Sequence, residues 1–316
     1  MLKKDPQILY HYCSLNTLSK IIGEINFGES ALGYLYGKKK LQKLDEKSKR
    51  RFESLLFTRM ISSVQLTSFH HLNDPKESVV IRDLYREVDE DDPPKGISDY
   101  FDCILKDRTK TFVFCMSEHP DNLTMWRAYG DDGRGVCIGF KREKLDELIS
   151  KAIGSLGKEE KSKIKALIKG VKYVSNREEL HDLNLCVCED IENGVDVSSM
   201  STDDILRRSV DCWSVKSSDY DIEKEWRLIV TMDDNYFNGE FVRQSYVFDP
   251  LKYFNLKYRF LDHDMTERLF LRLDADCIEE IIIGPKSRVK KGEMQRYLKS
   301  HFNDKVKVYK SKKPYV

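Results

Sequence analysis

Short apolar stretches, separated by turn-forming residues, recur along this chain and predict a series of β-strands. The first, at 8–13, is rich in aromatic and β-branched residues, and Ser14 after it is suited to cap a helix that ends at Gly23. Further strands are predicted at 64–69, 111–116, 136–140, 171–174, 222–230, 241–248, 258–261, 278–283 and 305–309. The spacing of apolar residues predicts helices within 38–57 and 141–170, and at 205–213 and 292–301. This mixture favours a single α+β domain over residues 1–316, with helical insertions at about 28–63 and 141–215.

Three glycines precede the strand at 136–140. Gly130, Gly133 and Gly135 follow the spacing G-x-x-G-x-G, which differs from the dinucleotide-binding fingerprint, and a strand rather than a helix comes next. The pattern therefore favours a hairpin turn over a phosphate-binding loop.

Composition and charge limit the partners, the compartment and the metal sites that we expect for this protein. The 54 Lys and Arg residues nearly balance 53 Asp and Glu residues, so the net charge of +1 gives no overall attraction to nucleic acid or membrane. The basic run at 38–51 is interspersed with acidic residues, so a solvated helix face is favoured over a patch for nucleic acid or an acidic partner. Because no leader-like or membrane-spanning apolar segment is evident, we expect a cytoplasmic protein. His181, Cys186, Cys188 and Cys212 lack the usual zinc-ligand spacing, so no metal centre is expected.

The stretch 222–230 concentrates the candidate chemistry. If it is a strand, Glu223, Glu225 and Arg227 lie on one face and Trp226 on the other. Neighbours on one face of a strand are about 7 Å apart, so Arg227 is expected to hold Glu225 ionised while the two glutamates raise each other's pKa. A solvated edge-strand face is the alternative interpretation.

Several segments together resemble a widespread bacterial family known only as a domain of unknown function. They are LYHYCS, SFHHLNDPKES, FVFCMSEHPDNLTMWRAYGDDGRGVCIGF, YDIEKEWRLI and IEEIIIGP, in this order. The most specific motifs are LNDP, D-N-x-x-M-W and E-x-E-W-R. The chain departs from the family in the charged insertion at 28–63 and in the segment between 141 and 215.

The order of candidate residues is also similar to that of ADP-ribosyltransferases, which implies a split, mainly antiparallel sheet and NAD as substrate. In this resemblance His11 lies on the first strand, Thr67 and Ser68 on a middle strand, and the catalytic Glu225 on a late strand preceded by Glu223. Glu225 would bind the nicotinamide ribose, with Arg227 keeping it ionised, and Glu223 would orient or deprotonate the acceptor. His11 would hold a ribose hydroxyl and Ser68 would support Glu225. Tyr12 or Trp126 would stack on the nicotinamide.

This resemblance implies an enzyme that cleaves the nicotinamide–ribose bond and transfers ADP-ribose to a protein, a nucleic acid or water, in the manner of a toxin or phage-defence effector. Two alternatives remain. A metal-dependent nuclease or phosphoesterase would use Asp74, Glu77, Glu223 and Glu225 as Mg²⁺ ligands. A non-enzymatic sensor or interaction module would use Asp74, Trp126 and Arg227 as a buried structural network.

Overall fold

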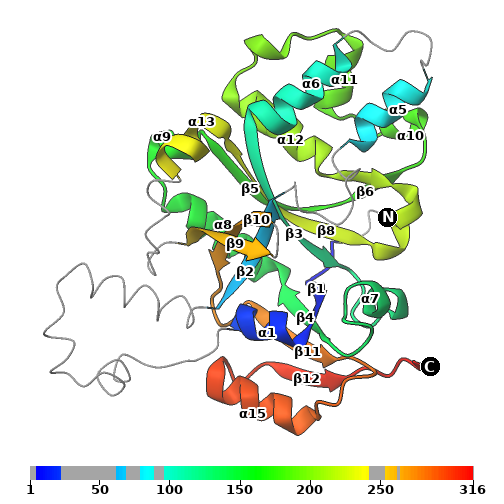
Figure 1. Cartoon of the computed structure of the whole chain (residues 1–316), viewed down its shortest axis with the longest axis vertical. Coiled ribbons are helices and arrows are strands. Elements are labelled where there is room, and N and C mark those ends of the chain that lie inside the picture. The colour runs from blue at the N-terminus through cyan, green and yellow to red at the C-terminus, as the bar shows by residue number, and fades with distance from the viewer. Residues whose placement is uncertain are drawn as a thin grey trace, which may run out of the picture.

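Ten strands within the described ranges form one mixed, mainly antiparallel sheet (Figure 1). The structure is a computed structural model that describes residues 5–22, 62–68, 79–88, 96–241, 253–261 and 264–315. The strands of this sheet are β1 (Ile8–Cys13), β2 (Ser63–Ser68), β3 (Thr109–Ser117), β4 (Val136–Lys141), β5 (Ile164–Gly170), β8 (Glu225–Asp233), β9 (Phe254–Leu261), β10 (Asp264–Arg272), β11 (Ile278–Ile283) and β12 (Lys307–Lys310). The α+β class predicted from the sequence is confirmed.

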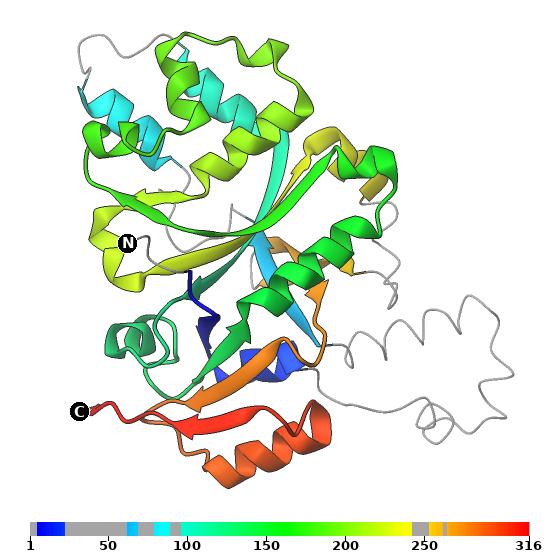
Figure 2. The same cartoon turned by 180° about the vertical axis from the view of Figure 1, so that it is seen from behind.

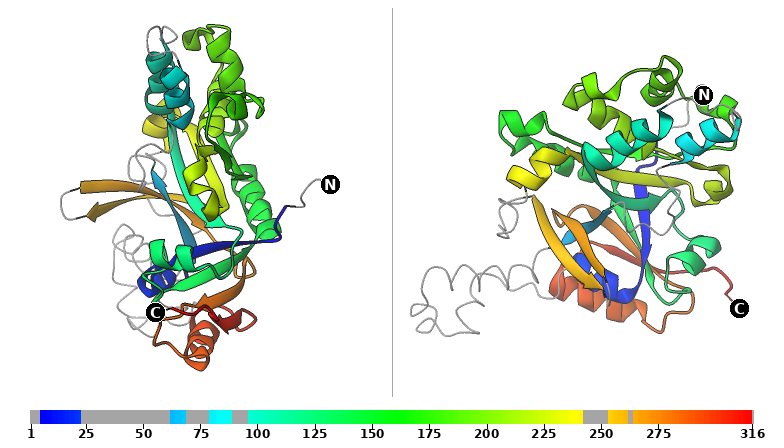
Figure 3. Two further views of the ribbon diagram at one scale, coloured as in Figure 1. Left: turned by 90° about the vertical axis from the view of Figure 1, so that its right-hand side faces the viewer. Right: turned by 45° about the horizontal axis from the view of Figure 1, so that its top comes forward.

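Strand β3 is the branch point of the sheet. One edge of β3 pairs along its whole length with β8, which pairs in turn with β5. The other edge pairs with both β2 and β1 at different positions. From β1 the sheet continues through β4 and β11 to β12, and from β2 through β10 to β9. The hairpin of β9 and β10 projects from the rest of the molecule (Figure 3).

Helices cover both faces of the sheet. The helices are α1 (Leu15–Ile22), α5 (Val80–Val88), α6 (Ile97–Asp102), α7 (Leu123–Ala128), α8 (Arg142–Gly154), α9 (Lys158–Lys161), α10 (Arg177–His181), α11 (Cys186–Glu192), α12 (Thr202–Cys212), α13 (Asp234–Tyr236) and α15 (Lys291–His301). Shorter or irregular turns are η2 (Cys103–Asp107), η3 (Val197–Ser199), η4 (Ser218–Glu223) and η5 (Phe237–Phe241). Among the described helices, none is long and apolar enough to cross a membrane.

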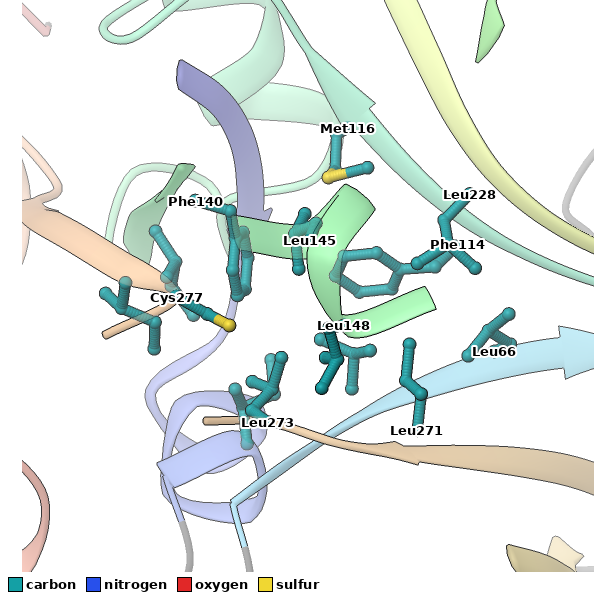
Figure 4. Packing of buried hydrophobic residues seen from close by; sticks show 14 of the residues in the cluster. Leu66, Phe114, Met116, Phe140, Leu145, Leu148, Leu228, Leu271, Leu273 and Cys277 are labelled. Carbon is teal, nitrogen blue, oxygen red and sulfur yellow. The ribbon is translucent and has the colours of Figure 1, made fainter. Parts of the chain in front are cut away.

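Alternate residues of β3 and β8 point to opposite faces of the sheet and belong to two different hydrophobic clusters. Phe114 and Leu228 belong to the larger cluster, which α8 closes with Leu145 and Leu148 (Figure 4). Figure 2 shows α8 lying across this face of the sheet. On the other face, Ile229 belongs to a cluster that includes residues of α5, α6, α11 and α12. Because successive strand residues point to opposite faces, one pair of strands holds both cores.

A small two-stranded parallel sheet lies beside the start of β8. It consists of β6 (Lys172–Val174) and β7 (Val215–Ser217), with Tyr173 opposite Lys216. The predicted strand at 171–174 is thereby confirmed, and the predicted helix at 205–213 is confirmed as α12.

Three predictions from the sequence were wrong. Residues 164–170 form strand β5, because their apolar residues pair with β8 rather than following a helical face. The three glycines lie between α7 and β4 rather than in a hairpin, because Asn122 caps a helix at 123–128 with its side-chain oxygen. Strand β8 begins at Glu225, since Glu223 ends the turn η4. The predicted strand at 241–248 and the predicted helix within 38–57 lie largely or wholly outside the described residues.

Candidate functional site

Two carboxylates and two cations form a buried ion cluster at the start of β8. Arg227 donates from Nε to Glu225 Oε1 at 2.8 Å and from Nη2 to Glu225 Oε2 at 3.0 Å. Lys216 Nζ lies 2.8 Å from Glu223 Oε2 and 3.3 Å from Glu225 Oε2. We refer to Lys216, Glu223, Glu225 and Arg227 as the ion cluster. Its two positive and two negative charges balance, as buried charges require.

The local backbone explains how Glu223 and Glu225 come to share one lysine. Lys224 between them has φ 42° and ψ 54°, a left-handed conformation that turns the chain from η4 into β8. Strand β7 places Lys216 beside both carboxylates, and Tyr173 on β6 accepts a hydrogen bond from the Glu225 amide at 2.7 Å. The two glutamates therefore meet through a turn and a neighbouring strand, not through the alternation of one strand.

Glu225 is held ionised by its neighbours. Burial alone would raise its pKa, but the attraction and hydrogen bonds of Arg227, followed by the charge of Lys216, outweigh burial and lower the pKa of Glu225 to about 2. The prediction that Arg227 keeps this carboxylate ionised agrees with that result. The expected raising of the Glu225 pKa by its neighbouring glutamate is not seen, because Arg227 and then Lys216 lower that pKa.

The two glutamates differ in their access to a ligand. The Glu225 side chain is 6 % exposed, and both of its oxygens accept hydrogen bonds from Arg227 or Lys216. The Glu223 side chain is 11 % exposed, and its Oε1 accepts a hydrogen bond from the Tyr129 hydroxyl at 2.7 Å. Tyr129 is 38 % exposed, so the bond at Glu223 Oε1 lies nearer the surface than those at Glu225.

Two tyrosines flank the outer side of the ion cluster. Tyr129 follows α7, and Tyr220 on η4 is 37 % exposed with its ring centre 4.4 Å from Lys216 Nζ. Burial, followed by the adjacent Glu223 carboxylate, raises the pKa of Tyr129, so its hydroxyl keeps its proton and donates it to the hydrogen bond. Glu223 and Lys216 are thus each in contact with a partly exposed tyrosine.

The first-strand candidates do not converge on the glutamates. Register pairing places Tyr10 opposite Ser117 and Ser117 opposite Glu225, so His11 points to the other face of the sheet from Glu225. There its ring lies 4.4 Å from that of Phe114, and its Nδ1 donates to the Cys115 carbonyl oxygen at 2.9 Å. Burial lowers the pKa of His11, which favours the neutral ring.

Tyr12 and Trp126 belong to a different part of the structure. The Tyr12 hydroxyl donates to the His119 carbonyl oxygen at 2.8 Å and accepts from the Asn122 amide at 2.9 Å. Trp126 is fully buried, packs edge-on against Tyr12 and donates to Asp121 Oδ1 at 2.6 Å. These contacts fix the segment before α7 and leave neither ring free to stack on a nicotinamide.

The two candidate residues on β2, Thr67 and Ser68, also lie away from Glu225. Ser68 pairs with Phe112, which is opposite Val230, so its side chain shares the face of the larger hydrophobic cluster. Its buried hydroxyl has no hydrogen-bond partner among the described residues. Thr67 is half-buried and its hydroxyl contacts Arg268. Ser68 therefore does not support Glu225.

A pocket of about 470 Å³ adjoins the ion cluster at Lys224 and Glu225. Its charged and aromatic lining comprises Asp5, Glu118, Arg142, Lys169, Lys172, Tyr173, Lys224, Glu225 and Trp226. The Arg142 guanidinium lies over the Trp226 ring at 4.5 Å and pairs with Asp5 at 2.6 Å. Lys172 is exposed and has no carboxylate partner within the described ranges. The pocket is thus lined by cations, carboxylates and aromatic rings together.

The described residues offer no cluster of three or more His, Cys, Asp and Glu side chains that would hold a metal ion. Asp74 and Glu77, the proposed Mg²⁺ ligands, lie outside the described residues.

Sequence reasoning missed Lys216, Tyr129 and Tyr173. Tyr129 lies in the segment LTMWRAYG, where the Asn122 cap was the available signal for a helix that places the tyrosine. Lys216 and Tyr173 lie in no recognisable sequence motif. They reach Glu225 only because β6 and β7 pair with each other.

The fold and site define an α+β protein with a buried ion cluster at the start of one strand. The model of a family of proteins of unknown function, DUF2971, matches residues 125–228. That range contains the whole ion cluster and Tyr129, and leaves out His11, Thr67 and Ser68. The match supports the resemblance to a domain-of-unknown-function family. No curated protein and no solved structure matches the chain.

Proposed function

We propose that this protein is an NAD-consuming enzyme in which Glu223 faces the nicotinamide ribose. Glu225 has a structural role in the ion cluster beside it. The observation that carries this proposal is the asymmetry of the pair. Both oxygens of Glu225 accept from buried cations, whereas Glu223 accepts from buried Lys216 at one oxygen and from the partly exposed Tyr129 hydroxyl at the other. This assignment exchanges the roles expected from the resemblance to ADP-ribosyltransferases.

Cleavage of the nicotinamide–ribose bond needs no general acid, because nicotinamide leaves as a neutral molecule. The bond from the ribose C1′ to the nicotinamide nitrogen breaks, and its electron pair leaves with nicotinamide, which becomes neutral. The positive charge that develops on the ribose is stabilised by a fixed carboxylate. An acceptor hydroxyl, amine or water then bonds to C1′ and gives its proton to Glu223.

Tyr129 and Tyr220 supply the aromatic surfaces for this site. Their partly exposed rings flank Glu223 and Lys216, and the cationic nicotinamide of NAD is attracted to the faces of such rings. A carboxylate with partly exposed tyrosines nearby suits a ligand that is positively charged before the reaction and in its transition state.

We assign the two phosphates of NAD to the adjoining pocket, where Lys172 is the exposed cation without a carboxylate partner among the described residues. Lys172→Gln is expected to raise KM for NAD several-fold with little change in kcat, because a phosphate contact far from C1′ binds ground and transition states alike. Steady-state kinetics of nicotinamide release measures both constants. An unchanged KM would exclude this placement of the phosphates.

Incubation with NAD labelled in its adenine and nicotinamide parts tests the proposal. Wild-type protein is expected to release nicotinamide, and Glu223→Gln to reduce the rate about 100-fold or more, because a charge-stabilising group is lost. Glu178→Gln, an exposed glutamate on α10, is the matched control and should keep the parental rate. Release that requires cell lysate, with adenine label entering protein or nucleic acid, identifies a transferase. Release without lysate identifies a glycohydrolase. No release in either arm would refute the proposal.

A second candidate, a non-enzymatic sensor or interaction module, is favoured by one observation. Arg227 is fully buried and donates hydrogen bonds to both oxygens of Glu225 and to the Trp213 carbonyl oxygen, the last at 3.0 Å. Such a closed network has a structural role without any reaction. This candidate predicts that Glu223→Gln has no effect on NAD because none is consumed.

A further inference from the structure

The C-terminal end of this protein is strongly basic. Residues 284–316 contain 11 Lys and Arg against two Asp and Glu, a net charge of +9 in a chain whose total is +1. The preceding 283 residues therefore carry −8. A separation of charge this large is typical of a local surface for a polyanion.

All eleven of these basic side chains are exposed. They are Lys286, Arg288, Lys290, Lys291, Arg296, Lys299, Lys305, Lys307, Lys310, Lys312 and Lys313, and we call them the C-terminal basic surface. Lys286 pairs with Asp132 and Lys307 with Glu279, while Lys310 donates to two backbone carbonyl groups. The other eight have no carboxylate partner within the described part of the chain. Their charge is therefore available to a ligand.

The fold gathers these charges around one end of the sheet. Strand β12 is the edge strand, and α15 packs on it through Met294, Leu298, Val306 and Val308 (Figure 1). The helix carries Lys291, Arg296 and Lys299 on its exposed side, and the segment after β12 carries Lys312 and Lys313. Lysines on an edge strand also discourage strand pairing, but those on α15 have no such use.

We propose that the C-terminal basic surface binds the phosphate backbone of nucleic acid without reading its sequence. A stretch of flexible lysines neutralises regularly spaced phosphates and releases their counterions. Tyr309, 45 % exposed and 5.8 Å from Lys291 Nζ, offers a ring on which an unpaired base stacks. The surface stands on observations separate from the ion cluster, so it holds whether or not NAD is the substrate.

Two other partners fit this surface less well. Tyr309 is the only large exposed hydrophobic side chain found in the described part of 284–316, so there is no set of apolar groups to enter a membrane. Protein–protein interfaces are depleted in lysine and have an apolar centre, whereas nine of the eleven cations here are lysines.

Fluorescence anisotropy with labelled single-stranded oligonucleotides, one of DNA and one of RNA and each of about 20 nucleotides, tests this proposal across a range of salt concentrations. The full-length protein is expected to bind with an affinity that falls steeply with salt. The quadruple variant Lys290→Gln, Lys291→Gln, Arg296→Gln and Lys299→Gln should bind at least about tenfold more weakly, with a log–log salt slope smaller by about 3.

A second quadruple variant controls for net charge. Lys106→Gln, Lys151→Gln, Lys158→Gln and Lys161→Gln removes four exposed cations elsewhere and should retain the parental affinity and salt slope. Circular dichroism confirms that both variants are folded. Equal losses in the two variants, no oligonucleotide binding by the parent, or binding to phosphatidylserine vesicles but not to oligonucleotides would overturn the proposal.

Discussion

At the scale of single residues, the ion cluster contains a carboxylate, Glu225, whose two oxygens are both held by protein cations. Glu225 carries its charge because Arg227 and Lys216 donate to it, and those donors occupy the oxygens that a substrate would need. Glu223 shares Lys216 but is otherwise bonded to Tyr129, which is partly exposed. In the proposed function, Glu225 therefore stabilises the fold and Glu223 is the carboxylate that takes part in the reaction.

The ionisation of Glu225 should make stability depend on pH in the acid range. Its pKa is about 2 in the folded protein against an ordinary 4.5, so its stabilising effect is complete above about pH 5 and is lost as the pH falls toward about 2. The contribution is about 3 kcal/mol. Urea unfolding from about pH 2.5 to 6 should show this loss in the parent and not in Glu225→Gln. Parallel pH profiles would show that Glu225 is not the group responsible.

The sequence allowed the Glu225–Arg227 pair to be predicted, because two residues on one strand face are neighbours whatever the rest of the fold does. It did not allow Lys216 to be predicted. The contact of Lys216 with Glu223 and Glu225 depends on the pairing of β6 with β7, and no local pattern encodes that pairing.

At the scale of elements, helix α7 links its N-terminal cap, Asn122, to Tyr129 at its C-terminal end. Asn122 caps α7 by accepting from the amides of Thr124 and Met125 at 2.8 and 3.2 Å, and Tyr129 follows the helix directly. The position of Tyr129 beside Glu223 therefore depends on how firmly this short helix is anchored.

Asn122→Ala should lower the free energy of unfolding by about 1 kcal/mol through loss of the cap. It should also slow NAD consumption a few-fold, because Tyr129 is no longer held beside Glu223. Asn176→Ala removes the cap of α10, where Asn176 accepts from the Glu179 amide at 2.9 Å, and is the matched control. It should cost a similar amount of stability and leave the rate unchanged. Equal rates in the two variants would remove Tyr129 from the mechanism.

Most elements were predictable because their signals are local. Ser14 does cap α1, accepting from the Thr17 amide at 3.1 Å, and the apolar run at 111–116 is the centre of β3. Strand β5 was not predictable, because Ile164 and Leu167 satisfy helical spacing as well as strand pairing. This segment forms a strand rather than a helix because it pairs with β8, which lies some 60 residues further along the chain.

At the scale of the whole molecule, β3 and β8 tie two hydrophobic clusters into one sheet. Leu228 and Ile229 are adjacent in sequence, fully buried, and belong to different clusters. If β8 detached from the sheet, both hydrophobic clusters would therefore be disrupted. We therefore expect the described parts of the chain to unfold together.

Leu228→Ala and Ile229→Ala should each lower the free energy of unfolding by about 2 to 5 kcal/mol. Both should shift the same cooperative transition, measured by calorimetry and by tryptophan fluorescence. Two transitions, each moved by only one of the variants, would instead show two independently folding units.

The separation of roles between Glu223 and Glu225 is the central claim, and paired measurements on their glutamine variants test it most directly. Nicotinamide release and urea unfolding would be measured on the same preparations. Glu223→Gln should slow release about 100-fold or more and lose less stability than Glu225→Gln, because Lys216 and Arg227 both keep their contacts with Glu225. Glu225→Gln should lose about 3 to 5 kcal/mol of stability, because Arg227 and Lys216 are left buried without their shared carboxylate. A stable, folded Glu223→Gln protein that releases nicotinamide at the parental rate would contradict the account.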